Sequence, residues 1–286
     1  MIHPKPSDVP AIDDYGKLLD GRIAVVTGGG SRGIGGGIAS LFAQHGALVE
    51  IAEIDAKRAE ESVAAITAAG GKVRAHVLDV TVPAEAEQLA KRVLEHHGRC
   101  DVLVNNVGDY RPLVRFAESG PESWDAMIRI NLLHFYAVTR AFIGSMIERR
   151  RGSIVNVHSV EGMRGYPGEP VYGSLKAAIV HFTTCLAAEQ GRNGIRVNGI
   201  GPDLTQTPQV DYITGFEDAS DLWPSWAPVG RLGWPEDHAR VALFLASDMS
   251  SFVTGHNIPV DGGSRAGGGW FFSPIAGRFV NRPTGL

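Results

Sequence analysis

The sequence predicts an α/β protein with a single three-layer domain, in which a doubly wound parallel sheet is covered by helices on both faces. Two observations support this class: apolar strand-like segments alternate with amphipathic helical segments, and no linker-like segment interrupts the alternation. The chain has 286 residues, of which 44% are hydrophobic and 20% charged, so it can form a substantial core. We expect the domain over 20–264, an N-terminal extension over 1–19 and a C-terminal tail over 265–286.

Strand-like and helix-like segments follow one another along the domain. Strands are expected at 22–27, 47–53, 72–79, 101–105, 153–157, 195–200 and 256–260. Helices are expected from Ile34 to a stop at Gly46, at 57–69, 84–97, 171–190 and 235–247, with a further long helix after Ser119. Repeated strand–helix units of this kind favour parallel strands joined by right-handed crossovers.

The long helix carries a polar residue where an apolar one is expected. Ser119 and Glu122 lie three residues apart and predict a capping box at the start of this helix. The apolar stripe that follows includes Met127 and Phe135, and Asn131 falls on the same stripe. A buried amide needs hydrogen-bond partners, so Asn131 is either a satisfied core residue or part of a site.

Composition argues against several functional classes. The chain has 27 Lys and Arg residues against 31 Asp and Glu residues, a net charge of −4, so no overall basic field favours nucleic acid or an anionic membrane. Its two cysteines, Cys100 and Cys185, match no disulfide framework or metal-binding spacing, and we expect no metal. The N-terminus lacks the apolar segment of a signal peptide, and no apolar run approaches the length of a bilayer span, so we expect a cytoplasmic protein.

A run of glycines, T-G-G-G-S-R-G-I-G at 27–35, lies between the first strand and the first helix. Glycines at such a turn let a pyrophosphate approach the backbone N–H groups at the N-terminus of the helix. The residues predicted to bind a dinucleotide here are Gly28, Gly29, Ser31, Arg32, Gly33, Ile34 and Gly35. Glu53, at the end of the second strand, can hydrogen-bond the adenosine ribose, although a solvated strand end is an equally good interpretation of a lone acid.

Ser159, Tyr172 and Lys176 form another candidate cluster. Tyr172 and Lys176 lie four residues apart near the start of a helix, so they share one face. Ser159 follows the strand that ends just before that helix. A Tyr–Lys pair usually lies on the protein surface without a functional role, but this one lies at the carboxyl end of a parallel sheet, where α/β folds bind ligands.

Taken in order, these motifs resemble the short-chain dehydrogenase/reductase family, in the type with a single Rossmann domain. The motifs are T-G-G-G-S-R-G-I-G at 27–35, N-N-V-G at 105–108, Asn131 in I-N-L-L, Ser159 with Y-G-S-L-K at 172–176, and R-V-N-G-I-G-P at 196–202. The resemblance covers about residues 20–264. It implies an oxidoreductase that transfers a hydride between NAD(P) and the carbon of an alcohol or ketone, with a small molecule as substrate.

The resemblance also implies a catalytic tetrad of Asn131, Ser159, Tyr172 and Lys176. Tyr172 would exchange a proton with the substrate oxygen, which Ser159 would hold. A free phenol has a pKa of about 10, and Lys176 together with the positive nicotinamide would favour the phenolate. Lys176 would also bind the nicotinamide ribose, and Asn131 would hold a water that links Lys176 to solvent.

Further cofactor contacts follow from the same resemblance. They are Asp79 and Val80 near the adenine, Asn106 and Gly108 beneath the cofactor, Tyr172 and Lys176 at the ribose, and Pro202 and Thr207 at the nicotinamide end. The family also implies a homo-oligomer, a tetramer or a dimer, built through the helix with Asn131, the helix with Tyr172 and the last strand.

The chain departs from the family pattern at several positions. The glycine motif carries one extra residue, so either Gly28 or Gly29 could make the first turn. Asp203 stands where relatives often have glycine and would place a charge near the nicotinamide. His158 and Glu161 flank Ser159 where small or apolar residues are common, and we interpret them as an outward-facing histidine and a loop acid.

Two residues favour different cofactors. Glu53 favours NAD, because it can repel a 2′-phosphate, whereas Arg32 is of the type that pairs with that phosphate in NADP-dependent relatives. Repulsion between a buried Glu53 carboxylate and a 2′-phosphate is hard to accommodate, whereas the flexible Arg32 side chain can easily turn elsewhere. We therefore predict NAD, with NADP as the less favoured cofactor.

A loop over 203–233 is too long for a simple connection and predicts a substrate lid. The lid and the tail are rich in aromatic residues: Tyr212, Phe216, Trp223, Trp226, Trp270, Phe271, Phe272 and Phe279. The lid aromatics favour an apolar or bulky substrate, and the tail is expected to pack on the body or on a neighbouring subunit.

The leading hypothesis is an NAD-dependent oxidoreductase for a secondary alcohol or ketone. One alternative is an NADPH-dependent 3-oxoacyl thioester reductase, which Arg32 favours and Glu53 opposes. Another is a non-catalytic nucleotide-binding protein of the same fold, which the presence of both Tyr172 and Lys176 opposes.

Overall fold

The structure, a computed structural model, describes residues 15–30, 32–112, 114–166, 169–210, 225–269, 271–273, 275 and 277–280. Several residues singled out in the sequence lie outside the described ones: Ser31, Tyr212, Phe216, Trp223 and Trp270. Of Phe271 and Phe279, the backbone alone is described.

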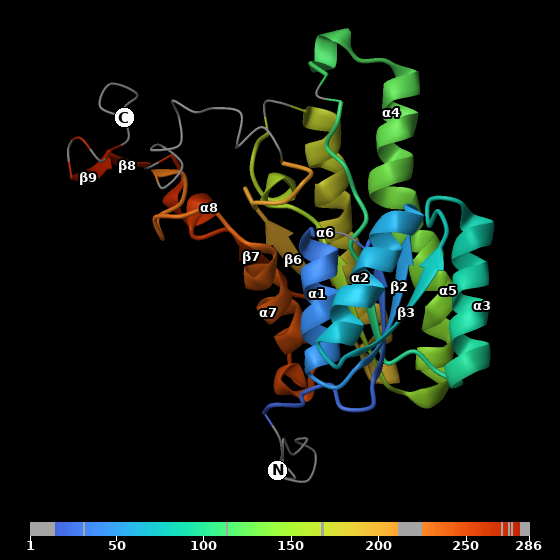
Figure 1. Cartoon of the computed structure of the whole chain (residues 1–286). Helices are drawn as coiled ribbons and strands as arrows, with labels where there is room; N and C mark the ends of the chain where they lie inside the picture. The colour runs from blue at the N-terminus through green and yellow to red at the C-terminus, as the bar shows by residue number, and fades with distance from the viewer. Residues whose placement is uncertain are drawn as a thin grey trace, which may run out of the picture.

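In the described part of the chain, seven parallel strands form one sheet in the order β3-β2-β1-β4-β5-β6-β7 (Figure 1). Their bounds are β1 Ile23–Thr27, β2 Leu48–Glu53, β3 Lys72–Val77, β4 Val102–Asn105, β5 Gly152–Val157, β6 Ile195–Pro202 and β7 Asn257–Val260. The chain winds outward from β1 to β3, returns to place β4 beside β1, and then winds the other way. Strand order therefore reverses between β1 and β4, where such folds form a ligand crevice at the carboxyl ends.

Helices cover both faces of this sheet, as the sequence predicts. One apolar core lies beneath α1 (Ile34–Gln44), α2 (Ala56–Ala68) and α7 (Pro235–Ala246). The other lies beneath α3 (Pro83–His97), α5 (His134–Arg149) and α6 (Pro170–Gln190). Phe42 in the first core and Phe142 in the second are fully buried, and each contributes about 1.5–3 kcal/mol by leaving water. The three-layer, doubly wound class is confirmed.

The predicted third strand is two residues too long, because the chain turns after Val77. The Asp79 carboxylate accepts a hydrogen bond from the Thr81 N–H at 2.9 Å, and the Asp79 carbonyl accepts one from Val82. An aspartate that bonds the backbone two residues ahead favours a turn over continued strand pairing.

The long helix begins at a different cap from the predicted one. The N-cap of α4 (Pro121–Ile128) is Gly120, and the Ser123 hydroxyl accepts from the Gly120 N–H at 3.2 Å. Ser119 instead ends the short 3₁₀ turn Phe116–Glu118, and its hydroxyl donates to the Phe116 carbonyl at 2.8 Å. The Ser119–Glu122 capping box was therefore wrong, because the preceding turn already uses the serine.

Between α4 and α5 the helix widens into a π-helical segment, Arg129–Leu133. Such segments are rare and occur often at functional sites. Asn131 lies at the centre of this segment and is fully buried.

The expectation that no apolar stretch reaches the length of a bilayer span was wrong. In the described chain, Pro121–Arg149 and Pro170–Asn193 are long and apolar enough by length and composition. Each packs one face on the sheet through residues such as Phe142 and Leu186, and core helices of soluble proteins meet the same test. Apolar side chains on the outer face, such as Leu133 at 50% exposure, account for the rest of this apolar character.

The described parts of the lid and tail lie at the carboxyl end of β6 and beyond β7. Thr205 forms an isolated β-bridge with Gly233, so the two ends of the lid meet. The tail forms a short helix, α8 (Ser264–Gly267), and an antiparallel hairpin of β8 (Phe271–Ser273) and β9 (Arg278–Val280). Figure 1 shows this hairpin projecting away from the sheet, with Phe272 39% exposed.

Candidate active site

The glycine loop makes its turn at Gly28, which resolves the two registers left open by the sequence. Gly28 has φ +65°, a left-handed conformation that glycine adopts without strain. A Cβ at Gly35 would lie 2.3 Å from the Gly28 carbonyl oxygen, so only glycine lets α1 pack this closely on the loop. The N-cap of α1 is Gly33, which has no side chain to cap the helix, and Arg32 beside it is exposed. Backbone N–H groups at a helix N-terminus favour an anion.

Glu53 at the end of β2 is buried against this loop, so its interpretation as a solvated strand end was wrong. Its side chain is 4% exposed, and its carboxylate accepts from the backbone N–H groups of Gly30 at 3.3 Å and Asp55 at 3.2 Å. The Arg58 guanidinium on α2 donates to it at 2.8 Å. The sequence did not predict the Arg58 contact, although Arg58 follows Glu53 by five residues, at the first turn of the next helix.

The other predicted cofactor contacts also lie at carboxyl ends of strands. Asn106, after β4, donates through its side-chain amide to the Thr27 carbonyl at 3.0 Å and so ties β4 to the glycine loop. Asp79 and Val80 follow β3, and Val80 is buried. Thr207 lies farther along in the described part of the lid.

Ser159, Tyr172 and Lys176 meet where β5, β6 and α6 come together. Tyr172 and Lys176 lie in the first two turns of α6, and the Lys176 Nζ is 5.3 Å from the centroid of the Tyr172 ring. The Ser159 side chain lies beside the Tyr172 phenol and acts to lower its pKa. The Ser159 hydroxyl donates to the Pro202 carbonyl at 3.4 Å, which connects the cluster to the end of β6.

Asn131 reaches the same cluster through Gly108. A Cβ at Gly108 would lie 2.7 Å from the Lys176 Nζ and 3.0 Å from the Asn131 Oδ1, so both side chains come close to this glycine. The Asn131 amide donates to the Asp109 carbonyl at 2.7 Å, and its oxygen accepts from the Asp109 N–H at 3.2 Å. The structure thus brings all four predicted tetrad residues to one place.

Burial sets the charge states of the cluster. Lys176 is 3% exposed, and burial lowers its pKa to about 8, against the opposing effect of the Asp109 carboxylate. Burial raises the pKa of Tyr172 well above its ordinary value, and the neighbouring Ser159 side chain only partly opposes this. The phenol of the protein alone is therefore protonated at neutral pH and can donate its proton.

Aromatic rings from two loops surround the Tyr172 phenol. Tyr110 and Tyr166 make edge-on contacts with the Tyr172 ring, with centroids 6.5 Å and 6.1 Å away. Gln209 of the lid donates to the Gly108 carbonyl at 3.1 Å and so lies over the same region. Sequence reasoning missed both tyrosines, because they lie in irregular loops that carry no periodic signal.

Arg164 joins the acids that flank the site into one network. Its guanidinium donates to Glu161 at 2.7 Å and to both Asp203 oxygens at 3.2 Å. Trp226 of the lid donates to Asp203 at 3.1 Å, and the hydroxyl of Ser264, the first residue of α8 and the last before the tail, donates to the same carboxylate. The network therefore links the loop after Ser159, the end of β6, the lid and the start of α8, and Glu161 is more than a loop acid.

His158 is buried rather than outward-facing, so that interpretation was wrong. It is 3% exposed, its Nδ1 lies 3.0 Å from the Ser159 carbonyl oxygen, and burial lowers its pKa to about 4. Cβ atoms at Gly199 and Gly201 would each lie 2.8 Å from a carbon of the ring, so these glycines on β6 make room for it. The alternating glycines of R-V-N-G-I-G-P were the sequence signal that could have predicted this.

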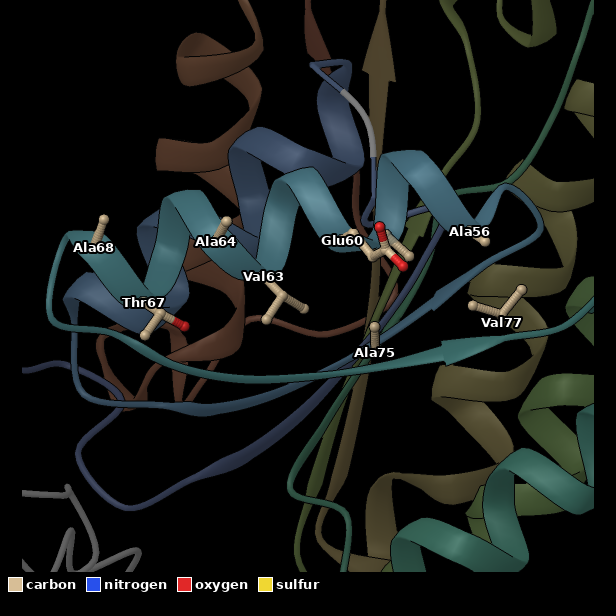
Figure 2. Close-up of a pocket in the computed structure, with 9 residues that line it drawn as sticks. Ala56, Glu60, Val63, Ala64, Thr67, Ala68, Ala75 and Val77 are labelled. Atoms are coloured by element: carbon tan, nitrogen blue, oxygen red, sulfur yellow. The ribbon is translucent and has the colours of Figure 1, made fainter.

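A large apolar cavity lies away from this cluster. It has a volume of about 610 Å³ and lies between α2 and the edge strand β3, where Figure 2 shows Val63 and Thr67 pointing from α2 toward the strand that carries Ala75. It includes none of the tetrad residues. Within the described residues, no group of three or more His, Cys, Asp or Glu side chains is arranged to hold a metal.

Comparison with known proteins agrees with this geometry. A family model described as Enoyl-(Acyl carrier protein) reductase matches residues 29–265. The 3-oxoacyl-[acyl-carrier-protein] reductase of Thermotoga maritima is 41% identical over 247 residues, which cover 86% of this chain and 98% of the relative. A (2S)-[(R)-hydroxy(phenyl)methyl]succinyl-CoA dehydrogenase subunit of Thauera aromatica is 38% identical over 247 residues, covering 86% and 97%.

Solved structures give the same result for the fold. A 7α-hydroxysteroid dehydrogenase complexed with NADH and 7-oxo glycochenodeoxycholic acid superposes with a TM-score of 0.81 at 32% identity. The match covers 88% of this chain and 98% of that one. The similarity thus extends over the sheet, its helices and the site at the carboxyl ends of the strands.

Proposed function

The chain belongs to the short-chain dehydrogenase/reductase family, and from this premise we propose that it interconverts a 3-oxoacyl thioester and the matching 3-hydroxyacyl thioester, with NAD(H) as cofactor. The observation that best supports this proposal is the 41% identity to a 3-oxoacyl-[acyl-carrier-protein] reductase, together with a complete tetrad. The relative from Thauera aromatica is also named for a hydroxylated acyl thioester. A 3-oxoacyl thioester is the substrate of the reductase named above as an alternative. It is also a ketone, and therefore falls within the substrate class of the leading hypothesis.

The residues present fit a dinucleotide. The left-handed turn at Gly28 and the close approach of Gly35 bring the start of α1 against the backbone of the loop, with no side chain at either of these two positions. Glu53 lies beside Gly30 at the end of β2, where a ribose hydroxyl could donate to it. The bound nicotinamide supplies the hydride for reduction and accepts it in oxidation.

The tetrad residues would then divide the proton chemistry among them. Tyr172 donates its phenolic proton to the carbonyl oxygen as that oxygen gains charge, and Ser159 donates a hydrogen bond to the same oxygen. Lys176 binds the ribose and returns a proton to the phenolate. Asn131 holds a water that connects Lys176 to solvent. The raised pKa of Tyr172 suits reduction, because the phenol is protonated at neutral pH.

Two observations support NAD(H) over NADP(H). Glu53 is buried against the glycine loop, so a 2′-phosphate there would meet a negative charge. Arg58, which could pair with that phosphate, is already engaged by Glu53 at 2.8 Å. Arg32 is exposed and remains the residue that favours NADP(H).

We also propose a homo-oligomer built through the outer faces of α5 and α6. Leu133 is 50% exposed and Tyr136 39% exposed on this face, where Tyr136 packs edge-on against Phe182 of α6. Apolar side chains of this kind gain free energy when a second subunit covers them. Light scattering on the purified protein is expected to give a dimer or tetramer, and Tyr136→Glu is expected to dissociate it. A monomeric wild type would contradict the proposal.

The function is tested by assaying acetoacetyl-CoA and longer 3-oxoacyl thioesters with NADH and with NADPH. The expected result is turnover of the thioester with NADH, lowered at least about 10³-fold in Tyr172→Phe, in which the proton donor is lost. A bulky ketone without a thioester serves as the competing substrate. Turnover of that ketone alone would contradict the thioester, and turnover that survives in Tyr172→Phe would contradict the mechanism.

A further inference from the structure

Another cavity, of about 390 Å³, lies at the amino end of the sheet. Arg22 directly precedes β1, Arg151 directly precedes β5, and Arg196 is the second residue of β6; all three line this cavity. Strand β5 spans six residues, so the cavity lies roughly 20 Å from Ser159 at the other end of the strand. It shares no described residue with the candidate active site.

The charges on the cavity wall do not balance. Among its described lining residues, three arginines face a single carboxylate, that of Asp248. Arg22 donates to the Asp248 Oδ2 at 2.6 Å, and Arg151 donates to the same oxygen at 3.3 Å. One carboxylate thus serves two guanidinium groups, which leaves a net charge of about +2 on the wall, since arginine stays protonated at physiological pH.

Arg196 is the guanidinium that Asp248 does not contact. It donates to the Ser250 hydroxyl at 2.7 Å and to the Ser247 carbonyl at 3.1 Å, and both of these acceptors are neutral. Burial lowers its pKa to about 10, and the charge of Arg22 adds to this effect, against the opposing charge of Asp248. A partly buried cation held by neutral groups gains more from an anionic partner than a solvated one does.

The cavity also has the donors and the space for such a partner. Each guanidinium carries five N–H groups, and the hydrogen bonds just described engage a minority of them. A volume of about 390 Å³ corresponds to roughly a dozen water molecules at about 30 Å³ each. This is enough for a tetrahedral oxyanion with a small group attached.

We propose that the cavity lined by Arg22, Arg151 and Arg196 binds a phosphate dianion, either free or as the phosphate group of a small monoester. The net charge of the wall matches a dianion, and forked guanidinium groups from three strands can bind several oxygens at once. Phe252, fully exposed at the rim, offers an apolar contact to the organic group of an ester. This site is independent of the proposed function, because the two lie at opposite ends of the sheet.

The experiment measures phosphate binding to the full chain by titration calorimetry, with sodium chloride at matched ionic strength as reference. Inorganic phosphate is expected to bind and to raise the melting temperature by about 2–5 °C at saturating concentration, because a ligand that binds only the folded state stabilises it. Phenyl phosphate forms a parallel arm. Tighter binding of phenyl phosphate, lost in Phe252→Ala, identifies a monoester, whereas equal binding identifies free phosphate.

Matched variants locate the binding. Arg151→Gln and Arg196→Met are expected to weaken phosphate binding at least about tenfold. Arg192→Gln removes the same charge from an exposed residue outside the cavity and is expected to change binding less than about twofold. Arg151 is 55% exposed at its side chain, so its replacement tests the site without a large cost in folding.

Two results would overturn the proposal. One is a wild type that shows no more response to phosphate than to chloride. The other is phosphate binding that survives in both Arg151→Gln and Arg196→Met, which would place the anion elsewhere, for example at the glycine loop. Neither result depends on catalytic activity, so failure here leaves the proposed function intact.

Discussion

Lys176 and Arg196 are two cations that the fold withdraws from solvent at opposite ends of one sheet. Burial lowers the pKa of Lys176 to about 8 and that of Arg196 to about 10. The physical cause is the same, but the outcomes differ. A lysine with a pKa near 8 can exchange protons close to neutral pH, whereas the arginine keeps its charge. One kind of burial therefore gives a proton-handling group at the carboxyl end and a fixed charge at the amino end.

The largest expected effect is that of Lys176→Met. We expect activity to fall at least about 10³-fold, because the ribose contact and the proton path are both lost. We expect the free energy of unfolding to rise by about 1–3 kcal/mol, because a buried charge whose pKa is lowered destabilises the fold. Urea unfolding and steady-state kinetics measure the two effects. Lys91→Met, at an exposed position, is the control; a less stable Lys176→Met would contradict the account of burial.

The pH dependence of stability separates the two cations further. Lys176 has a pKa of about 8 in the folded chain and about 10.5 when solvated, so the unfolded chain holds the proton more tightly between these values. Stability attributable to this residue is therefore lowest below pH 8 and rises with pH up to about 10.5. We expect the difference in the free energy of unfolding between Lys176→Met and wild type to fall by about 2–3 kcal/mol between pH 7 and pH 10.

The difference in the free energy of unfolding between Arg196→Met and wild type is expected to stay constant up to about pH 9, because the arginine keeps its proton there. Unfolding of both variants and the wild type at a series of pH values provides the measurement. Parallel curves for the two positions would remove the distinction between them.

Arg58 differs from Arg196 in its partner, because Arg58 is paired with the Glu53 carboxylate, whereas Arg196 bonds only neutral acceptors. In Glu53→Gln the negative charge is lost and Arg58 is released. We expect the ratio of the NADPH and NADH dissociation constants to move at least about tenfold toward NADPH. Fluorescence titration measures both constants, and Glu60→Gln on the exposed face of α2 is the control. Addition of Arg58→Met should reverse the gain; an unchanged ratio in Glu53→Gln would mean that Glu53 does not select the cofactor.

The smallest expected effect is on the stability of Arg196→Met in phosphate-free buffer. Arg196 contacts two neutral acceptors, its burial costs free energy, and the repulsion by Arg22 partly cancels the attraction by Asp248, so its removal should change the free energy of unfolding by less than about 1 kcal/mol. Chemical unfolding at low ionic strength measures this change. A loss above about 3 kcal/mol would make Arg196 a structural anchor rather than an anion ligand.

The two ends of the sheet also differ in how much of each the sequence could predict. Tyr172 and Lys176 are four residues apart on one helix, so local spacing was enough to pair them. The glycine run and the alternation of strands and helices are local signals as well, although the choice of Gly28 over Gly29 for the turn came from the structure. These signals predicted the fold class and placed Ser159, Tyr172 and Lys176 at one end of the sheet, whereas Asn131 was assigned to the tetrad only by the family resemblance.

The missed features depend on contacts between distant segments. Arg22, Arg151 and Arg196 are separated by more than a hundred residues at the extremes, and no local pattern connects them. The Arg164 network joins residues from a loop, a strand end and the tail in the same way. His158 was misplaced because the space for its ring is made by glycines on the neighbouring strand.

The π-helical segment around Asn131 has a consequence for the backbone itself. A widened turn interrupts the regular i→i−4 bonding, and here side chains fill the gap: Asn131 donates to the Met127 carbonyl at 3.2 Å, and the His134 Nε2 lies 2.9 Å from the Ile130 carbonyl. Burial lowers the pKa of His134 to about 4, so the ring stays neutral. The segment behaves as a one-residue insertion. Deleting one residue between 129 and 133 would restore a continuous α-helix and rotate Asn131 by about 100° relative to α5, away from Lys176.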